Sequence, residues 1–309
     1  MSKFEHKNLN GVMPAMITSF NKDESINKEG LRKIINHLIA EKVSGLYVTG
    51  STGETFLMSP EEKKKVIDII VEEVNGRVPV IAHVGSIGTK ITADLADYAT
   101  KAGVDGLSAL PPFYYNFTNE EIFNYYSDIA QSSHLPIIIY NIDRANLMDI
   151  ETLKKLAAIE NIKGVKYTAA THFNFEVIKK DIGNDFKIYN GMDQMAISGL
   201  ISGADGLIGS FYNLMPEVFI EIYENMKKGN ISEAKKLQTK ANIIILYAVK
   251  KAGYSFIKMG LNWMDLDSGY VRRPFTSFID KEIEKEIKKD LRDLSLENDL
   301  TGIKFLDAL

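Results

Sequence analysis

The amino-acid sequence predicts an α/β protein, a (β/α)8 TIM barrel with a C-terminal helical extension. Three observations predict this fold class: short apolar segments recur along the chain, segments with helical periodicity separate them, and each such unit takes roughly 25 to 35 residues. A doubly wound parallel sheet is the competing architecture. Eight regular units without a break in composition favour the barrel over that sheet.

Each predicted strand is an apolar, β-branched run that Gly, Pro or Asn residues bound. The runs are continuous in hydrophobicity instead of alternating, which is typical of parallel strands buried on both faces. The predicted strands are 12–18, 45–49, 78–84, 106–110, 136–141, 164–168, 186–190 and 206–210. Eight such runs are the number that a closed parallel barrel of this class needs.

Helical segments separate the predicted strands. The first has apolar residues at the spacing of one helical face. They are Leu31, Ile34, Ile35, Leu38 and Ile39. The second begins with Ser59 as the N-cap, Pro60 at the first helical position and Glu61 against the helix dipole. Similar patterns predict helices over 91–102 and 118–132.

After the eighth strand the alternation ends and helical segments alone follow. They are predicted over 217–228, 231–252, 256–264 and about 281–294. No Pro/Gly/Ser-rich linker separates them from the preceding units. We therefore assign residues 1–229 to the barrel and residues 230–309 to a helical extension that packs on it as part of one structural unit.

The composition excludes several classes of protein and of site. The chain has 309 residues, no cysteine and a formal net charge of −4. Without cysteine it forms no disulfide, no thiolate metal site and no cysteine nucleophile. Its mildly acidic charge is spread along the chain, which argues against nucleic acid as a partner.

Two further features concern location and metals. The longest apolar run, 243–249, is far shorter than the roughly 18 residues that cross a membrane, and residues 1–7 contain no apolar signal-peptide core. We therefore expect a cytoplasmic protein with no membrane partner. The histidines have no metal-ligand spacing, so we expect no metal. They are His6, His37, His83, His134 and His172. His83, in a predicted strand, is expected to be a hydrogen-bonded core residue.

The functional site of such a barrel lies at the C-terminal ends of its strands, and unusual residues occur there. The second strand leads into the segment 50–54, Gly-Ser-Thr-Gly-Glu, and the fifth ends in Tyr140 and Asn141. The sixth contains Lys166 and ends at Thr168. The residues after the seventh and at the end of the eighth are Gly191, Met192, Asp193, Gln194, Gly209 and Ser210.

Lys166 interrupts an apolar strand, where a charged side chain is costly to bury. Burial disfavours the ammonium form, and the neutral amine is a nucleophile that forms Schiff bases with carbonyl groups. The alternative is a lysine whose stem packs in the core while its head reaches solvent or a carboxylate. Other reactive residue types at the same rim favour the nucleophile.

Tyr140 and the segment 50–54 fit the same chemistry. A phenol beside a lysine or its iminium can shuttle protons, although a tyrosine at a strand end is often a half-buried packing residue. Glycines that flank Ser51 and Thr52 allow a ligand close to the backbone, whose N–H groups can hold a carboxylate. The segment 85–90 only superficially resembles a phosphate loop, because it lacks the GxxxxGK[ST] order.

With these residues the chain resembles the N-acetylneuraminate lyase and dihydrodipicolinate synthase superfamily of Schiff-base aldolases. The shared motifs are the segment 50–54, Tyr140-Asn141 and Gly164-Val165-Lys166, and the resemblance covers nearly the whole chain. It is similar to the lyase branch at Ser51, where the synthase branch typically has Thr. The synthase branch also has an Arg five residues after the strand-end Tyr, where this chain has Ala145, with Arg144 one place early.

The resemblance implies a class I aldolase that reversibly cleaves N-acetylneuraminate to N-acetylmannosamine and pyruvate. Lys166 would form the Schiff base, and Tyr140 would relay the proton of the C4 hydroxyl. Ser51 and Thr52 would hold the pyruvyl carboxylate. The residues that would line the sugar-chain part of the pocket are Thr168, Gly191, Asp193, Gln194 and Ser210. The resemblance implies no cofactor besides the covalent Schiff base, and a small-molecule 2-keto acid (sialic acid, pyruvate) as partner.

The superfamily is typically tetrameric, so the resemblance also implies a homotetramer. Tyr114 or Tyr115 would reach into a neighbouring subunit, and packing within the subunit is the alternative for both. Three positions depart from the usual lyase pattern: Gln194 replaces a Glu, Asp143 a Pro and Met192 an aromatic residue. The neutral amide of Gln194 can still donate and accept hydrogen bonds with polyol hydroxyls.

Three alternatives remain beside the lyase. A dihydrodipicolinate synthase and a 2-keto-3-deoxy-sugar-acid aldolase share Lys166 and Tyr140 with it. The third is a sugar-acid binding or regulatory protein on the same fold, which has no need of a nucleophile in an apolar strand.

Overall fold

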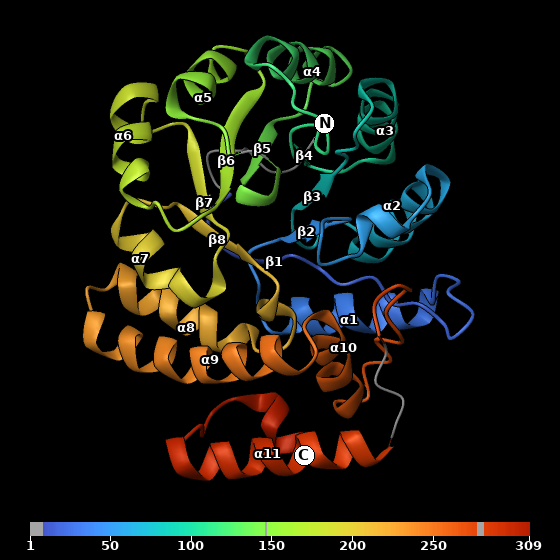
Figure 1. Ribbon diagram of the computed structural model, residues 1–309, viewed down its shortest axis with the longest axis vertical. Coiled ribbons are helices and arrows are strands. Elements are labelled where there is room, and N and C mark those ends of the chain that lie inside the picture. The colour runs from blue at the N-terminus through green and yellow to red at the C-terminus, as the bar shows by residue number, and fades with distance from the viewer. Residues whose placement is uncertain (1–8, 146, 277–280) are drawn as a thin grey trace.

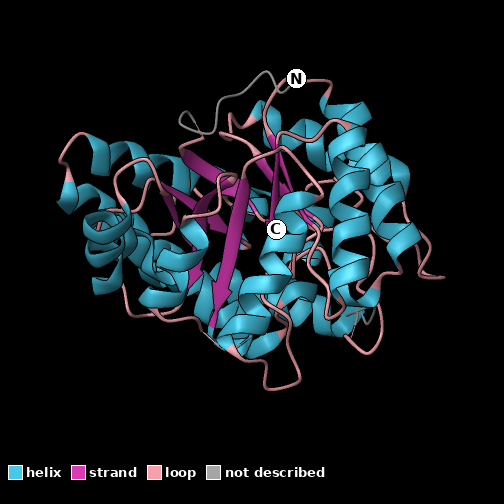
Figure 2. Cartoon of the chain, turned by 90° about the horizontal axis from the view of Figure 1, so that it is seen from above, coloured by secondary structure: helices cyan, strands magenta, loops and turns pink. Residues whose placement is uncertain are grey.

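The computed structural model describes residues 9–145, 147–276 and 281–309. Eight parallel strands form one sheet in the order β1-β8-β7-β6-β5-β4-β3-β2. The ends of this sheet meet through an isolated parallel bridge between Ala15 and Tyr47, so the barrel is nearly closed, with helices around it (Figures 1 and 2). The predicted (β/α)8 barrel and C-terminal helices are confirmed. Residues 1–7, in which the sequence predicts no signal-peptide core, lie outside the described residues, and so does His6.

Each of the eight predicted runs overlaps one strand. The strands are β1 (Gly11–Pro14), β2 (Leu46–Val48), β3 (Val80–His83), β4 (Gly106–Ala109), β5 (Ile137–Ile142), β6 (Ile162–Thr168), β7 (Lys187–Asn190) and β8 (Gly206–Gly209). Most are shorter than predicted, because the apolar runs continue past the hydrogen-bonded ladder. In the first run, for example, Met16 and Ile17 are buried although β1 ends at Pro14.

The helices alternate with the strands and then continue alone. They are α1 (Lys28–Ala40), α2 (Pro60–Val74), α3 (Thr89–Ala102), α4 (Asn119–Gln131), α5 (Ile150–Ala157), α6 (Phe173–Ile182), α7 (Ala196–Ile201), α8 (Pro216–Lys227), α9 (Ile231–Lys251), α10 (Tyr254–Trp263) and α11 (Lys281–Asn298). Ser59 is the predicted N-cap of α2, in a capping box with Glu62. The periodicity predicts no range for α5, α6 and α7, each of which has ten residues or fewer.

The core has two layers. The larger lies between the strands and the surrounding helices, and a smaller one fills the interior of the barrel. Tyrosines in the interior layer satisfy their hydroxyls internally: the Tyr47 hydroxyl donates to Ser108 Oγ at 3.1 Å, and the Tyr189 hydroxyl to the Leu9 carbonyl at 2.7 Å. The interior is therefore a packed floor beneath the C-terminal ends of the strands.

The C-terminal helices cover one side of the barrel. In Figure 1, α9 lies along α8, α10 follows at the end of α9, and α11 lies outside them. Phe256 of α10 is fully buried, and its ring lies against the rings of Trp263 and Phe305, with centroids 6.4 and 6.3 Å away. No helix in the described part of the chain has both the length and the apolar character to cross a membrane.

We expect the outer helix α11 to contribute strongly to the stability of the whole unit. Leu291 is fully buried, whereas Leu296 on the same helix is 85% exposed. Leu291→Ala should lower the free energy of unfolding by about 2–5 kcal/mol, and the matched Leu296→Ala should change it by less than about 0.5 kcal/mol. Urea unfolding followed by circular dichroism measures both changes. Equal effects of the two substitutions would contradict the packing of α11 on the barrel.

Candidate active site

Lys166 and Tyr140 lie side by side near the C-terminal ends of β6 and β5, where they are partners in the strand register. The Lys166 amine lies 4.0 Å from the centre of the Tyr140 ring and 4.6 Å from that of the Tyr47 ring. Tyr47 belongs to β2, so residues from three strands surround the amine. Strand alternation aims these side chains into the mouth of the barrel.

The environment of Lys166 makes its amine reactive. The residue is only 5% exposed. Burial lowers the pKa of Lys166 to about 7, although the charge of Asp193 acts in the opposite direction. A large fraction of the side chain is therefore uncharged at neutral pH, as a nucleophilic amine requires. The sequence predicts that the apolar strand favours the neutral amine. The burial of Lys166 and its lowered pKa are in line with this.

Asp193 is the second buried ionisable group of the site. It lies in a short 3-10 helix, Asp193–Met195, directly after β7. Burial raises the pKa of Asp193 to about 6, although its Oδ2 accepts a hydrogen bond from the Phe211 N–H at 2.8 Å. Gly209 makes this position possible, because a Cβ there would lie 1.9 Å from Asp193 Oδ1. The charges of Asp193 and Lys166 each shift the pKa of the other group, so the two side chains lie close enough to interact.

The segment 50–54 reaches the same centre from β2. The Ser51 hydroxyl is a hydrogen-bond partner of the Tyr140 phenol and partly offsets the effect of burial, which raises the pKa of Tyr140. The Thr52 and Ser210 hydroxyls lie 2.7 Å apart, which ties this segment to the end of β8. Gly50 is required at the turn, since a Cβ there would lie 2.7 Å from the Tyr47 ring.

A cavity of about 310 Å³ opens beside Asp193. Its lining includes all five residues that the sequence assigns to the sugar chain: Thr168, Gly191, Asp193, Gln194 and Ser210. Gly191 keeps the route to the amine open, because a Cβ there would lie 1.9 Å from Thr168 Oγ1 and 3.3 Å from Lys166 Cε. The wall opposite these residues is apolar, from Leu246 and Val249 of α9.

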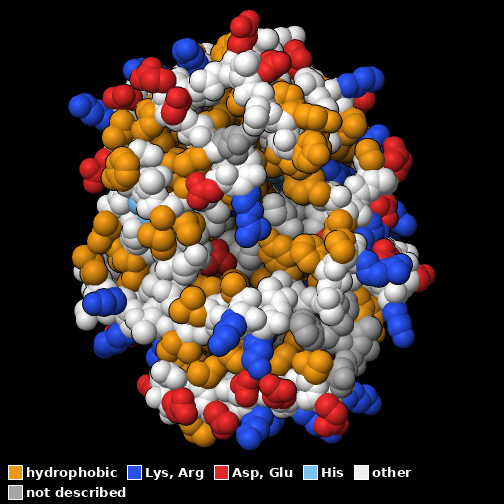
Figure 3. Space-filling model, in the orientation of Figure 1, with side chains coloured by type: hydrophobic (Ala, Val, Ile, Leu, Met, Phe, Trp, Pro, Cys, Tyr) orange, Lys and Arg blue, Asp and Glu red, His pale blue; other side chains and the backbone are white. Residues whose placement is uncertain are grey.

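A second cavity, of about 350 Å³, lies on the Tyr140 side and includes Ser51 and Arg144. Tyr254, the first residue of α10, lines both cavities. Figure 3 shows this face of the molecule hollowed near its centre, with hydrophobic side chains along the rim. Tyr254 and Tyr47 are not among the site residues that the sequence predicts. No local pattern marks Tyr254, whereas the position of Tyr47 in the second predicted strand is a signal that could have found it.

Tyr114 and Tyr115 lie apart from this centre. They are 84% and 61% exposed, and neither lines the two cavities. Tyr114 has a φ of 79°, a conformation that is rare for a bulky residue. Its ring packs edge-on against Tyr115 at 5.0 Å. Both side chains therefore point away from the core of their own subunit.

The histidines take structural positions where the structure describes them. His83 is buried, and its Nε2 accepts a hydrogen bond from the Leu110 N–H at 3.3 Å. Burial lowers the pKa of His83 to about 3, so its ring is neutral. The prediction of a hydrogen-bonded core histidine is confirmed. In the described ranges, no three His, Asp or Glu side chains gather in a way that could hold a metal ion.

The pKa of Lys166 is open to direct measurement. After reductive methylation with ¹³C-formaldehyde, one dimethyl-lysine resonance should titrate near pH 7, because burial disfavours the charged amine. NMR spectra of Lys166→Ala should lack this resonance, whereas those of Lys163→Ala, a change in the same strand, should retain it. A Lys166 resonance that titrates near the ordinary lysine pKa of about 10.4 would contradict the buried environment.

Comparisons with known proteins show the family of this chain. The model of the dihydrodipicolinate synthetase family matches residues 8–294. An N-acetylneuraminate lyase from Clostridium perfringens is 39% identical over 286 residues, which cover 91% of this chain and 99% of the relative.

Two solved structures are also similar. One, from Clostridium difficile, was solved in complex with mannosamine; it has a TM-score of 0.89 and 37% identity, with 92% of this chain and 99% of that chain covered. The other is a catalytic lysine mutant of a sialic acid aldolase from Ruminococcus gnavus, with a TM-score of 0.88 and 30% identity, covering 96% and 99%. The chain belongs to the dihydrodipicolinate synthetase family.

Proposed function

We propose that this chain is an N-acetylneuraminate lyase, a class I aldolase that reversibly cleaves N-acetylneuraminate to N-acetylmannosamine and pyruvate. The observation that carries the proposal is the buried amine of Lys166, with a pKa of about 7, beside the ring of Tyr140. The names of the most similar relatives support the choice of substrate. The enzyme is accordingly a carbon–carbon lyase.

The reaction begins with the neutral amine of Lys166. It attacks the C2 ketone of the open-chain substrate, and the carbinolamine loses water to give a protonated imine. The Ser51 and Thr52 hydroxyls and backbone N–H groups hold the adjacent carboxylate, which orients C2 toward the amine. This step needs no cofactor, because the amine of Lys166 itself converts the ketone into a protonated imine, which is the stronger electrophile.

Cleavage then uses the imine as an electron sink. The Tyr140 phenol passes its own proton to the substrate carboxylate while it takes up the proton of the C4 hydroxyl, and the proton on the carboxylate is later delivered to C3. The C3–C4 bond breaks, its electron pair moves to the imine nitrogen, and N-acetylmannosamine leaves as the aldehyde. Protonation of the enamine at C3 and hydrolysis of the imine release pyruvate and restore Lys166.

The polyol chain of the sugar lies in the 310 Å³ cavity in this proposal. Thr168, Ser210 and Gln194 offer hydroxyl and amide groups to its hydroxyls, and Asp193 accepts hydrogen bonds when it is ionised. Gly191 leaves the space that the chain needs next to Thr168. A neutral Gln194 makes the outer part of the pocket less acidic than a Glu would.

The proposal includes a homotetramer in which one of the tyrosines of the 114–115 pair contacts a neighbouring subunit. The exposure of both rings and the positive φ of Tyr114 support this assignment, since such conformations persist where function requires them. We also place the enzyme in the cytoplasm. Its cysteine-free fold, which needs no disulfide, is compatible with a reducing compartment.

Dihydrodipicolinate synthase is the second candidate, and one observation favours it. Arg144, one place early for the synthase pattern, still lines the cavity that contains Tyr140 and Ser51. A guanidinium there could bind the carboxylate of an aldehyde acceptor such as aspartate semialdehyde. Ser51 and the lyase relatives favour the first candidate.

Borohydride trapping tests the mechanism. With pyruvate, the wild type should form a stable carboxyethyl adduct by mass spectrometry, because reduction of the imine fixes the ligand on Lys166. Lys166→Ala should lose the adduct and the activity, and Lys163→Ala should keep both. Tyr140→Phe should keep the adduct while kcat for cleavage falls by about 10²- to 10⁴-fold. An unmodified wild type would reject the aldolase mechanism.

Substrate profiling tests the identity of the reaction. Pyruvate release should be faster from N-acetylneuraminate and its N-glycolyl analogue than from 2-keto-3-deoxygluconate, because the cavity beside Asp193 has room for a long polyol chain. Condensation of pyruvate with aspartate semialdehyde should be slow. The ratio of kcat/KM values decides, and a higher value for aspartate semialdehyde would assign the chain to the synthase branch.

A further inference from the structure

The segment 50–54 ends in a residue of unusual conformation and burial. Glu54 has φ 60° and ψ 36°, in the left-handed region that glycine normally occupies. Its side chain is fully buried, with 0% exposure. A left-handed non-glycine residue and a buried carboxylate are both unfavourable alone, and they persist where the surrounding structure enforces them.

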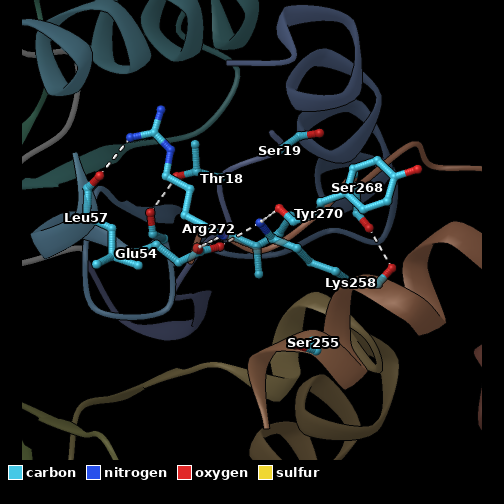
Figure 4. Close-up of polar contacts among 12 residues, drawn as sticks. Thr18, Ser19, Glu54, Leu57, Ser255, Lys258, Ser268, Tyr270 and Arg272 are labelled. Atoms are coloured by element: carbon cyan, nitrogen blue, oxygen red, sulfur yellow. Dashed lines mark hydrogen bonds and ion pairs between the residues drawn. The ribbon is translucent and has the colours of Figure 1, made fainter. Parts of the chain in front are cut away.

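Two residues of the C-terminal region supply the contacts that Glu54 needs. The Lys258 ammonium donates to Glu54 Oε1 at 2.6 Å, and the Arg272 backbone N–H donates to Oε2 at 2.7 Å. Lys258 is itself buried, at 2% exposure, and also donates to the Tyr270 carbonyl at 2.6 Å. Figure 4 shows its ammonium between Glu54 and Tyr270. Each carboxylate oxygen of Glu54 thus has its own donor.

Arg272 also holds the chain immediately after Glu54. Its guanidinium donates to the Leu57 carbonyl at 2.7 Å and pairs with Glu62 in the first turn of α2. One residue before Glu54, the Gly53 carbonyl accepts a hydrogen bond from the Thr18 hydroxyl at 2.8 Å. The backbone that presents Ser51 and Thr52 is therefore anchored on its C-terminal side by residues from the end of the chain.

We propose that Glu54, Lys258 and Arg272 form a positioning clamp, by which the C-terminal extension fixes the segment 50–54 for binding the carboxylate of the 2-keto acid. The proposal rests on the proposed function, because that carboxylate is the ligand of Ser51 and Thr52. None of the three clamp residues touches the reacting atoms. They act through the backbone orientation of Ser51 and Thr52, three and two residues before Glu54.

Loss of the clamp should weaken the binding of a carboxylate without changing the amine of Lys166. In Lys258→Met and in Glu54→Gln, the pyruvate concentration for half-maximal borohydride trapping should rise about 10- to 100-fold, since misplacement by about 1 Å has effects of this size. The pH midpoint of trapping should stay near 7, because burial in the barrel sets the pKa of Lys166. Acetone, a ketone without a carboxylate, should be trapped equally by the wild type and both variants.

The chain offers a matched control. Lys304 and Glu41 form another ion pair at 2.6 Å between the end of the chain and the barrel, and neither lines the two cavities. Lys304→Met and Glu41→Gln should leave the half-maximal pyruvate concentration unchanged. An equal rise in these controls would show a general effect of loosening the extension and would overturn the clamp.

The double variant Lys258→Met/Glu54→Gln separates positioning from stability. Neither buried charge is then left unpaired, so the melting temperature should recover toward that of the wild type. The half-maximal pyruvate concentration should remain raised, because Met cannot hold residue 54. If the melting temperature and the half-maximal pyruvate concentration both returned to the wild-type values, Lys258 and Glu54 would be only a stabilising contact and the proposal would be overturned. An equal loss of pyruvate trapping and acetone trapping would also overturn it.

The outcomes separate this proposal from the proposed function. A wild type that forms no adduct with pyruvate would reject the Schiff-base mechanism itself. A wild type that forms the adduct, with folded variants that trap pyruvate at unchanged concentration, would reject the positioning clamp alone.

Discussion

The site depends on one constraint: the amine of Lys166 lies in the apolar mouth of the barrel, where water cannot stabilise its charge. Strands that are buried on both faces create this environment, and the rings of Tyr47 and Tyr140 are close neighbours of the amine. The same burial raises the pKa of Asp193, so its charge cannot fully restore that of the lysine. The reactivity of Lys166 therefore follows from the closure of the barrel more than from any single neighbour.

The C-terminal helices complete this environment. Tyr254 of α10 lines both cavities, and Lys258 of the same helix neutralises the carboxylate at the end of the segment 50–54. Leu246 and Val249 of α9 form the apolar outer wall. A division of the chain at residues 229 and 230 thus separates two regions by sequence, but both contribute side chains to one site. Lys166, Tyr140 and Asp193 come from the barrel, and the extension lines the cavities around them.

Much of this was predictable from the sequence, because the signals are local. Continuous apolar runs predict buried parallel strands, and a lysine within such a run is conspicuous, so the fold and Lys166 follow directly. The predicted ends of the strands were less accurate, since burial extends beyond the hydrogen-bonded ladder. The contributions of Tyr254 and Lys258 were not predictable. Both lie in α10, which follows the predicted barrel, and only the folded structure brings Lys258 to Glu54, 204 residues away in the sequence.

That separation has a consequence for synthesis of the protein. The ribosome releases the chain from its N-terminus, so Glu54 emerges long before the cation that neutralises it. A nascent chain that ends after β8 already contains every strand of the barrel and Lys166, yet its segment 50–54 still lacks the contacts of Glu54 with Lys258 and Arg272. These contacts can form only after Lys258, in the middle of α10, and Arg272 have been synthesised. Under the proposed positioning role of Glu54, an incomplete chain therefore lacks the support that binding of the 2-keto acid requires.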